Sequence, residues 1–300
     1  MDPSEFDVKR ATLSIVVGSQ NARSTVSECL QALCRQQDGC ETEVIVVDNS
    51  TDGTDTIVTG RFPSVKLIRM PASCLVPELW EAGIRASTGS VVAIMTAHCV
   101  PDDNWLQEVL KAHHETAYAG IGGAIENHES GGIVEWAVYF CRYAPYMRPF
   151  HPHVIKDIPG DNASYKRWAL DHCVEVRRNG FWEPDVHAAL RKIGCQLLMS
   201  PAIVVWHKHS FTFLGFMRQR FWHGRQFGMS RALRISGTRR LLYVLASPLI
   251  PFIFVARIMR QLLTKRRHLK PFVFTFPVLM CFLLSWTSGE LTGYLWIVKK

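Results

Sequence analysis

Polar side chains that bind nucleotides, bind metals or accept protons follow several short apolar runs of this chain. The candidates are Asn21, Asp48, Asp52, Thr96, His98, Asp161, Asn162, Glu183, Asp185 and His207. A carboxylate that ends a strand beside a glycine-containing turn, as Asp48 does, is well placed to read the edge of a nucleotide base. Glu183 and Asp185 precede a helical pattern, and a carboxylate within hydrogen-bond reach of a hydroxyl can take its proton. Histidines such as His98 and His207 bind metals or phosphates.

Elements of an α/β sheet are predicted to hold these residues. Apolar and β-branched runs predict strands over 13–17, 44–47, 65–68, 91–95 and 120–125. Helical patterns are found over 26–33, 79–86, 102–118 and 184–193. Strands that alternate with helices indicate a mostly parallel sheet with helices on both faces. Ligands of such sheets bind beyond the carboxyl ends of the strands, where Asn21, Asp48 and Thr96 fall.

Charge and hydropathy divide the chain near residue 210. Residues 1–210 carry 19 Lys and Arg against 25 Asp and Glu, a net charge of −6, whereas residues 211–300 carry 15 against one, a net charge of +14. A basic region binds nucleic acid or an anionic membrane surface, and the long apolar runs between the cations favour the membrane. The nine cysteines form no C-x-x-C pair, which favours reduced thiols in the cytosol over disulfides or a zinc site.

Three regions are predicted from these patterns: an α/β domain over 1–210, basic aromatic interfacial helices over 211–240 and membrane-anchoring hydrophobic segments over 241–300. An ordinary basic helix packed on the domain is the alternative for the middle region. The run 241–256 contains two prolines and falls short of the ~20 residues that a spanning helix needs. With basic clusters on both sides of it, we expect this run to dip into the bilayer and return. The run 271–289 either spans the bilayer or turns back near its end.

The order and spacing of these signals resemble the family-two glycosyltransferases of the GT-A fold, over nearly the whole chain from Leu13. The matching segments are 14–17 with Asn21, 46–54, 91–101 with Trp105, 159–167, 182–187 and 204–209. The resemblance is greatest to bacterial membrane-associated enzymes of exopolysaccharide and lipid-linked glycan assembly. It implies that residues 1–210 form a catalytic domain that binds a nucleotide sugar.

The resemblance places the donor nucleotide at the first two strand ends. Val17 and Asn21 match the nucleotide-binding loop of the family. Asp48 matches the aspartate that accepts a hydrogen bond from uracil, and Asp52 follows in the same turn. The alternative is that the two aspartates only cap this turn.

The segment 95–101 departs from the family pattern. Thr96 and His98 stand where the D-x-D metal motif has its two aspartates, with Ala97 between them. A neutral imidazole suits Mn²⁺ better than Mg²⁺, so a divalent cofactor, Mn²⁺ or Mg²⁺, is left open. His98 is expected to ligate a metal together with His207, to contact the donor phosphates directly, or to be a spectator.

Two later segments match the place where the sugar is transferred. Asp161 and Asn162 match residues that hydrogen-bond sugar hydroxyls, although a turn with no further role is the alternative. Glu183 matches the catalytic base, with Asp185 in reserve. Two exposed acids that start a helix are the alternative there, because acids favour helix N-termini.

The basic region also carries a match, in Gln219, Trp222 and Arg225. In the membrane-bound group this element takes the place of the QxxRW motif of processive synthases, which is absent here. The resemblance implies that the three residues close over the donor and that Arg225 neutralises the leaving diphosphate.

Together these features predict an inverting glycosyltransferase that moves a sugar from a nucleoside diphosphate sugar, UDP-linked by the match at Asp48. The expected acceptor is a lipid or lipid-linked glycan at the cytoplasmic face of a membrane, in bacteria the inner membrane. The expected partners are the nucleotide sugar, this acceptor and the membrane, but no nucleic acid. The alternatives are a catalytically inactive nucleotide-sugar-binding or scaffold member of the same fold, and sugar transfer without a metal.

Overall fold

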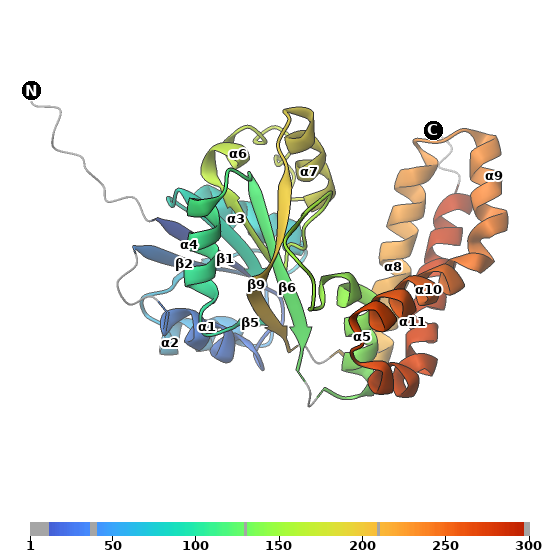
Figure 1. Ribbon diagram of the computed structural model, residues 1–300, viewed down its shortest axis with the longest axis horizontal. Helices are drawn as coiled ribbons and strands as arrows, with labels where there is room; N and C mark the ends of the chain where they lie inside the picture. The colour runs from blue at the N-terminus through green and yellow to red at the C-terminus, as the bar shows by residue number, and fades with distance from the viewer. Residues whose placement is uncertain (1–11, 37–40, 129–130, 209–210, 297–300) are drawn as a thin grey trace, which may run out of the picture. The chain divides into compact units, whose positions relative to one another are not determined.

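The computed structural model describes residues 12–36, 41–128, 131–208 and 211–296, which belong to two compact units (Figure 1). The first unit comprises Met1–Glu126 and Arg148–His209, and the second comprises Asn127–Met147 and Ser210–Lys300. Residues 127–147 belong to the second unit, whereas the sequence predicts them in the α/β domain. They group with the C-terminal helices because aromatic side chains of this segment pack there, with Trp136 and Phe140 lying 4.7 and 5.6 Å from the rings of His268 and Phe272.

The first unit is built on one mixed sheet. Its strands are β1 (Leu13–Ser19), β2 (Thr42–Asp48), β3 (Lys66–Arg69), β4 (Val91–Thr96), β5 (Cys99–Pro101), β6 (Gly120–Asn127), β7 (His153–Ile155), β8 (Asn162–Lys166) and β9 (Leu197–His207). The order is β3-β2-β1-β4-β8-β6-β9-β5, with β7 paired to β9. The first four strands are parallel, whereas β8 is antiparallel to β4 and β6, and β5 and β7 are antiparallel to β9. The predicted α/β class is confirmed.

Helices cover both faces of this sheet. They are α1 (Val26–Cys34), α2 (Thr54–Arg61), α3 (Val76–Ala86), α4 (Trp105–Glu115), α6 (Arg167–Asp171) and α7 (Glu183–Lys192). Every residue of β1, β4 and β6 is buried, so side chains on both faces of the central strands are covered. These strands are continuous apolar runs rather than alternating ones for the same reason.

The register of the strands brings four chain positions to one edge of the sheet. Ser19 at the end of β1 is paired with Asp48 at the end of β2. On the other side of β1, Gly18 is paired with Thr96 at the end of β4. Because β8 is antiparallel to β4, it begins at this edge, with Asn162 beside the end of β4. Residues from four separate parts of the sequence therefore meet where the sequence predicted a ligand site.

The second unit is helical. It contains α5 (Ile133–Tyr143), η1 (Ala144–Tyr146), α8 (Phe213–Ala232), α9 (Gly237–Ala246), η2 (Ser247–Leu249), α10 (Ile250–Lys265) and α11 (Leu269–Leu295). α8 and α11 run in the same direction and touch through glycines. A Cβ added at Gly224 would lie 2.2 Å from the carbonyl oxygen of Trp286, and one at Gly289 would lie 2.0 Å from that of Phe221. Small residues spaced four apart let helix backbones approach this closely, as they do in membranes.

Two helical segments of the described chain, Gly237–Lys265 and Leu269–Leu295, are long and apolar enough to cross a membrane by length and composition. The first is interrupted by the 3₁₀ turn Ser247–Leu249, which contains Pro248, and Pro251 follows at the start of α10. The second continues as one helix through Gly289 and Glu290. The alternative that the chain turns back near the end of run 271–289 is therefore wrong, because these residues are helical and pack against α8.

Candidate active site

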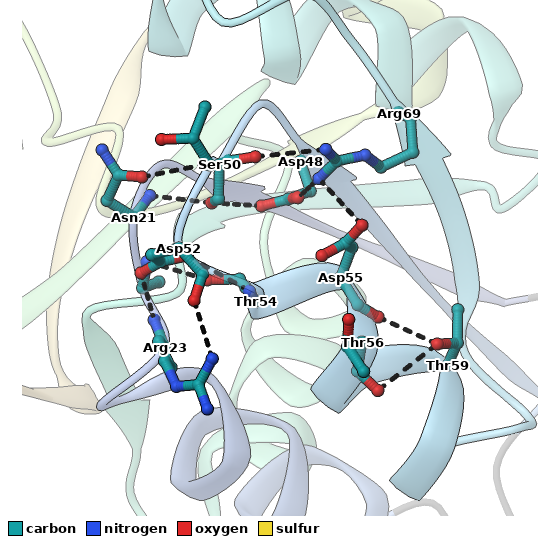
Figure 2. A network of polar contacts seen from close by, with 12 residues as sticks. Asn21, Arg23, Asp48, Ser50, Asp52, Thr54, Asp55, Thr56, Thr59 and Arg69 are labelled. Atoms are coloured by element: carbon teal, nitrogen blue, oxygen red, sulfur yellow. Dashed lines mark hydrogen bonds and ion pairs between the residues drawn. The ribbon is translucent and has the colours of Figure 1, made fainter.

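A network of polar side chains surrounds Asp48 at the carboxyl ends of β1 and β2 (Figure 2). Asp48 is wholly buried, and its carboxylate accepts hydrogen bonds from Ser50 Oγ at 2.5 Å and from the guanidinium of Arg69. Ser50 Oγ accepts the backbone N–H of Asn21 at 2.7 Å. The amide oxygen of Asn21 in turn accepts the N–H of Thr51 at 3.1 Å. Two residues predicted from the sequence, Asn21 and Asp48, are therefore joined through Ser50.

Arg69 is the member of this network that the sequence analysis missed. It ends β3, and its guanidinium also donates to the carbonyl oxygen of Ser50 at 3.1 Å and lies 3.6 Å from Asp55 Oδ2. A carboxylate has about four acceptor directions, and Ser50 and Arg69 occupy two of those of Asp48. Its position directly after the third predicted strand, 65–68, is the sequence signal that marks Arg69.

Asp52 holds the turn between β2 and α2. Its Oδ1 accepts the N–H and the hydroxyl of Thr54 at 3.1 and 2.6 Å, and its Oδ2 accepts the N–H of Arg23 at 3.1 Å. Burial acts to raise the pKa of Asp52, but these hydrogen bonds outweigh it and the pKa is lowered. The turn-capping alternative describes these contacts, and nucleotide binding by Asp52 stays a prediction.

The end of β4 and the start of β8 meet through Thr96 and Asp161. The hydroxyl of Thr96 donates to Asp161 Oδ1 at 2.9 Å, and both side chains are buried. His98 faces another part of the site, since its Nδ1 lies 3.3 Å from the hydroxyl of Thr25 on the loop before α1. The structure thus joins Thr96 to Asp161 and places His98 beside the β1–α1 loop.

The segment that replaces the D-x-D motif does not form a metal site from protein side chains alone. His98 and His207 lie on neighbouring segments, because the N–H of Lys208 donates to the carbonyl oxygen of His98 at 2.8 Å. Within the described ranges, however, no three His, Cys, Asp or Glu side chains lie close enough together to hold a metal ion. A divalent ion at this place would need ligands from the substrate, as Mg²⁺ commonly takes from phosphates.

Glu183 begins α7 and lies against the segment that leads into Asp161. Its Oε1 accepts the N–H of Gly160 at 3.2 Å. Position 160 has no room for a side chain, since an added Cβ would lie 2.5 Å from Glu183 Oε1 and 2.6 Å from Cη2 of Trp80. The close approach of the Gly160 backbone therefore holds the carboxylate of Glu183 against the segment that leads into Asp161.

Trp80 and Gly160 were not singled out from the sequence. The indole N–H of the buried Trp80 donates to the carbonyl oxygen of Met95 at 2.8 Å, which fixes the ring at the end of β4. No sequence signal marks Trp80, because the apolar pattern of a helix does not show which part of the fold each apolar residue packs against. Asp185, the reserve base, is exposed on α7 and its role stays a prediction.

Two predicted residues lie in the core. Val17 is wholly buried in β1 between β2 and β4. The amide nitrogen of Asn162 donates to the carbonyl oxygens of Ala124 and Ile203 at 2.9 and 3.1 Å. Its amide oxygen accepts the indole N–H of Trp105 at 2.9 Å. Asn162 therefore ties β8 to β6, β9 and α4, and a contact with sugar hydroxyls stays a prediction.

Gln219, Trp222 and Arg225 lie on α8, in the second unit. The guanidinium carbon of Arg225 lies 5.2 Å from the ring centroid of Trp222 and 4.5 Å from that of Trp296. These distances suit cation–π contacts. The structure assigns the three residues to a different unit from Asp48 and Glu183, and their contact with the donor stays a prediction.

Comparison with known proteins identifies the family and the fold of the chain. The family model "Glycosyl transferase family 2" matches residues 14–173. Among solved structures, the mannosyltransferase PcManGT from Pyrobaculum calidifontis, in complex with GDP-Man and Mn²⁺, has 17% identity and a TM-score of 0.54, with 95% of this chain and 88% of that chain covered. S. aureus TarS 1–349 has 12% identity and a TM-score of 0.49, with 93% and 90% covered. No curated protein sequence matches the chain.

The family match begins in β1 and extends past β8, so it contains the strand ends that carry Asn21, Asp48, Thr96 and Asp161. The mixed sheet with its covering helices is the fold shared with the archaeal mannosyltransferase. The chain therefore belongs to glycosyl transferase family 2, a family of enzymes that transfer sugars from nucleotide sugars.

Proposed function

We propose that this glycosyltransferase inverts the sugar it transfers, takes it from a UDP-linked donor and delivers it to a lipid or lipid-linked glycan. The observation that carries the proposal is the contact of Glu183 with Gly160. Through it, a carboxylate from α7 is held at the residue before Asp161, and Asp161 itself bonds to Thr96 at the end of β4. A proton acceptor is thus held beside the strand edge where the nucleotide sugar is expected.

The chemistry assigned to Glu183 is general base catalysis. The acceptor hydroxyl oxygen attacks the anomeric carbon of the donor, and its proton passes to the carboxylate of Glu183. The bond from the anomeric carbon to the diphosphate breaks, and its electron pair leaves with the nucleoside diphosphate. Attack on the side opposite the leaving group inverts the anomeric centre.

Base recognition is assigned to Asp48. Its buried carboxylate can accept the ring N–H of uracil, while Arg69 offers guanidinium donors at the same place. The mannosyltransferase of similar fold was solved with GDP-Man, so GDP-sugars are the necessary comparison. Calorimetric titration with UDP and with GDP separates the two, because only tighter binding of UDP agrees with the assignment.

Charge on the leaving diphosphate needs compensation, for which two sources are proposed. Arg225 supplies a permanent cation. A divalent ion is the second source, and the mannosyltransferase was solved with Mn²⁺. The imidazoles of His98 and His207 suit Mn²⁺ better than Mg²⁺. Titration of UDP with and without Mn²⁺, in the wild type and in His98→Ala, tests this role, and transfer that survives a chelator would leave Arg225 and His98 as the cations.

A membrane acceptor is supported by the second unit. Large apolar side chains are exposed along its helices, namely Leu241, Leu242, Leu245, Leu249, Phe252, Ile253, Val273 and Phe274. Such surface is stable in lipid rather than in water. In this proposal the run 241–256 dips into the bilayer and returns, so the basic clusters at 239–240 and 265–267 both lie on the cytoplasmic side and the active site would face the cytoplasm. Accessibility of cysteines introduced at positions 266 and 267 in membrane vesicles tests this orientation.

The decisive experiment is Glu183→Gln in detergent-solubilised protein. The release of nucleoside diphosphate from UDP-glucose, and in parallel from GDP-mannose, is measured with a membrane lipid extract as acceptor. We expect turnover to be lost while calorimetric binding of UDP changes little, because the base does not touch the nucleotide. Glu175→Gln is the control, an exposed acid of the same unit paired with Arg178. Unchanged turnover in Glu183→Gln would refute the base, whereas wild-type protein that binds UDP without turnover would favour the inactive alternative.

A further inference from the structure

The segment that presents Gly160 to Glu183 is fastened to α7 at a second point. His187 lies one helical turn after Glu183, on the same face of α7. Its Nδ1 lies 3.2 Å from Asp157 Oδ1, three residues before Gly160. The segment 157–160 is therefore tied to α7 at both of its ends, by Asp157 to His187 and by Gly160 to Glu183.

A buried hydroxyl completes this tie. The hydroxyl of Tyr165, from β8, lies 2.8 Å from His187 Nε2, and neither side chain is exposed. A carboxylate only accepts hydrogen bonds, so Nδ1 of His187 carries the proton that Asp157 binds. In the neutral ring Nε2 is then the acceptor of the Tyr165 hydroxyl. The three side chains form one directed chain, from Tyr165 through His187 to Asp157.

Burial of His187 keeps this arrangement in one protonation state. Burial lowers the pKa of His187 to about 4, against the opposing effect of Asp157, and Arg191 lowers it further. Arg191 also holds the segment from the other side, since its Nη1 donates to the carbonyl oxygen of Lys156 at 2.5 Å and lies 3.4 Å from Asp157 Oδ1. The imidazole is neutral at physiological pH, so the hydrogen-bond directions stay fixed.

We propose that His187 is a positioning residue of the transfer reaction: by joining Tyr165 on the sheet to Asp157, it fixes segment 157–160 so that the N–H of Gly160 holds the carboxylate of Glu183. This inference rests on the proposed role of Glu183 as the base. His187 does not touch the substrate in this scheme. It acts through the backbone of segment 157–160, whose next residue, Asp161, bonds to Thr96.

The role has a kinetic signature that a merely structural histidine would lack. An N–H that donates to a carboxylate favours its charged form. When His187 no longer holds the segment, Glu183 loses this donor and takes up a proton at higher pH. The acidic limb of the kcat/KM profile then moves to higher pH, and kcat falls while the KM for the donor stays nearly constant. A displacement of about 1 Å at a catalytic group can cost 10²-fold in rate, so we expect a loss of about 10-fold to 10²-fold.

A matched control is available in His113. This histidine is also buried in the first unit, its Nε2 lies 2.8 Å from Ser164 Oγ, and burial lowers its pKa to about 4 as well. His187→Phe and His113→Phe therefore remove equivalent groups, and only the first contacts the segment that bonds to Glu183. Tyr165→Phe deletes one hydroxyl and keeps the ring. It replaces His187→Phe as the test variant if His187→Phe does not fold.

The experiment is the pH dependence of kcat/KM for nucleoside diphosphate release from the donor sugar nucleotide, UDP-glucose or GDP-mannose, that the wild type turns over. An acidic limb shifted to higher pH in His187→Phe or Tyr165→Phe, but unmoved in His113→Phe, supports the proposal. The proposal is overturned if the acidic limbs of all three variants coincide with that of the wild type, or if they move equally in all three variants. Glu183→Gln separates the two claims: retained turnover removes the base and the positioning role together, whereas lost turnover with unmoved limbs overturns only the role of His187.

Discussion

Replacing Gly160 with alanine tests how closely the base is held. The backbone of Gly160 is not in the left-handed region, so alanine adds only a methyl group. That methyl carbon would lie 2.5 Å from Glu183 Oε1, 2.6 Å from Cη2 of Trp80 and 2.8 Å from its Cζ3. Ordinary contacts begin at 3.4 Å, so the carboxylate must retreat by about 0.9 Å.

The indole cannot move aside to relieve the contact. Trp80 is 4% exposed, and its N–H is bonded to the carbonyl oxygen of Met95. The carboxylate of Glu183 is the end of a longer and half-buried side chain, so it gives way at its own contact. The contacts with the indole must be relieved by the backbone of residue 160, which should also lower the free energy of unfolding. A shift of this size at a catalytic group corresponds to a loss of up to about 10²-fold in kcat. Binding of the nucleotide at Asp48 is expected to change little.

The assay is nucleoside diphosphate release by Gly160→Ala, together with calorimetric binding of UDP and the free energy of unfolding in urea. The control is Gly60→Ala, because a Cβ at position 60 meets nothing within 4 Å. Position 60 lies in α2, where alanine stabilises a helix by up to about 1 kcal/mol relative to glycine. A Gly160→Ala enzyme that keeps wild-type kcat and stability would refute the reasoning that residue 160 and Glu183 are in contact during turnover.

Three further predictions concern stability. Because the pKa values of His113 and His187 are lowered to about 4 from 6.5, the unfolded chain binds more protons between these values. The contribution of each histidine to the free energy of unfolding should therefore be complete above about pH 6.5. It should be lost as the pH drops toward 4, by up to about 3 kcal/mol for each histidine. Urea titrations at several pH values measure this loss, and a free energy of unfolding that does not change with pH would contradict it. Asn162→Ala leaves three buried hydrogen-bond partners unpaired and should cost about 3 kcal/mol or more in the same titration, whereas a cost near zero would mean that the amide is replaceable by water. Gly289→Leu should lower the melting temperature in detergent, because its Cβ would lie 2.0 Å from a backbone carbonyl of α8, while Gly237→Leu, which meets nothing within 4 Å, should not.

Much of the candidate site at the carboxyl ends of the strands could be predicted from local sequence. Strands such as 13–17 and 91–95 are continuous apolar runs, and such runs are buried on both faces whatever their neighbours are. Polar residues that follow these runs fall at one edge because parallel strands all end there. Asn21, Asp48 and Thr96 were found in this way, and the change in charge near residue 210 marked most of the helical unit.

Contacts between distant segments were decided only by the tertiary structure. The bond from Gly160 to Glu183 spans 23 residues, and the bond from Thr96 to Asp161 spans 65. Nothing in either sequence neighbourhood specifies its partner, because partners are set by how β4, β8 and α7 pack. The assignment of 127–147 to the second unit has the same origin, since its aromatic side chains find their partners more than 120 residues later.

The sequence by itself thus determined which residue types stand at the strand ends and where the chain becomes basic and apolar. Only the folded structure decided that Arg69 bonds to Asp48, that the side-chain amide of Asn162 makes its hydrogen bonds within the core, and that the backbone N–H of a glycine holds Glu183. The physical reason is range: periodicity and charge act over a few neighbouring residues, whereas hydrogen-bond partners depend on the packing of elements far apart in the chain.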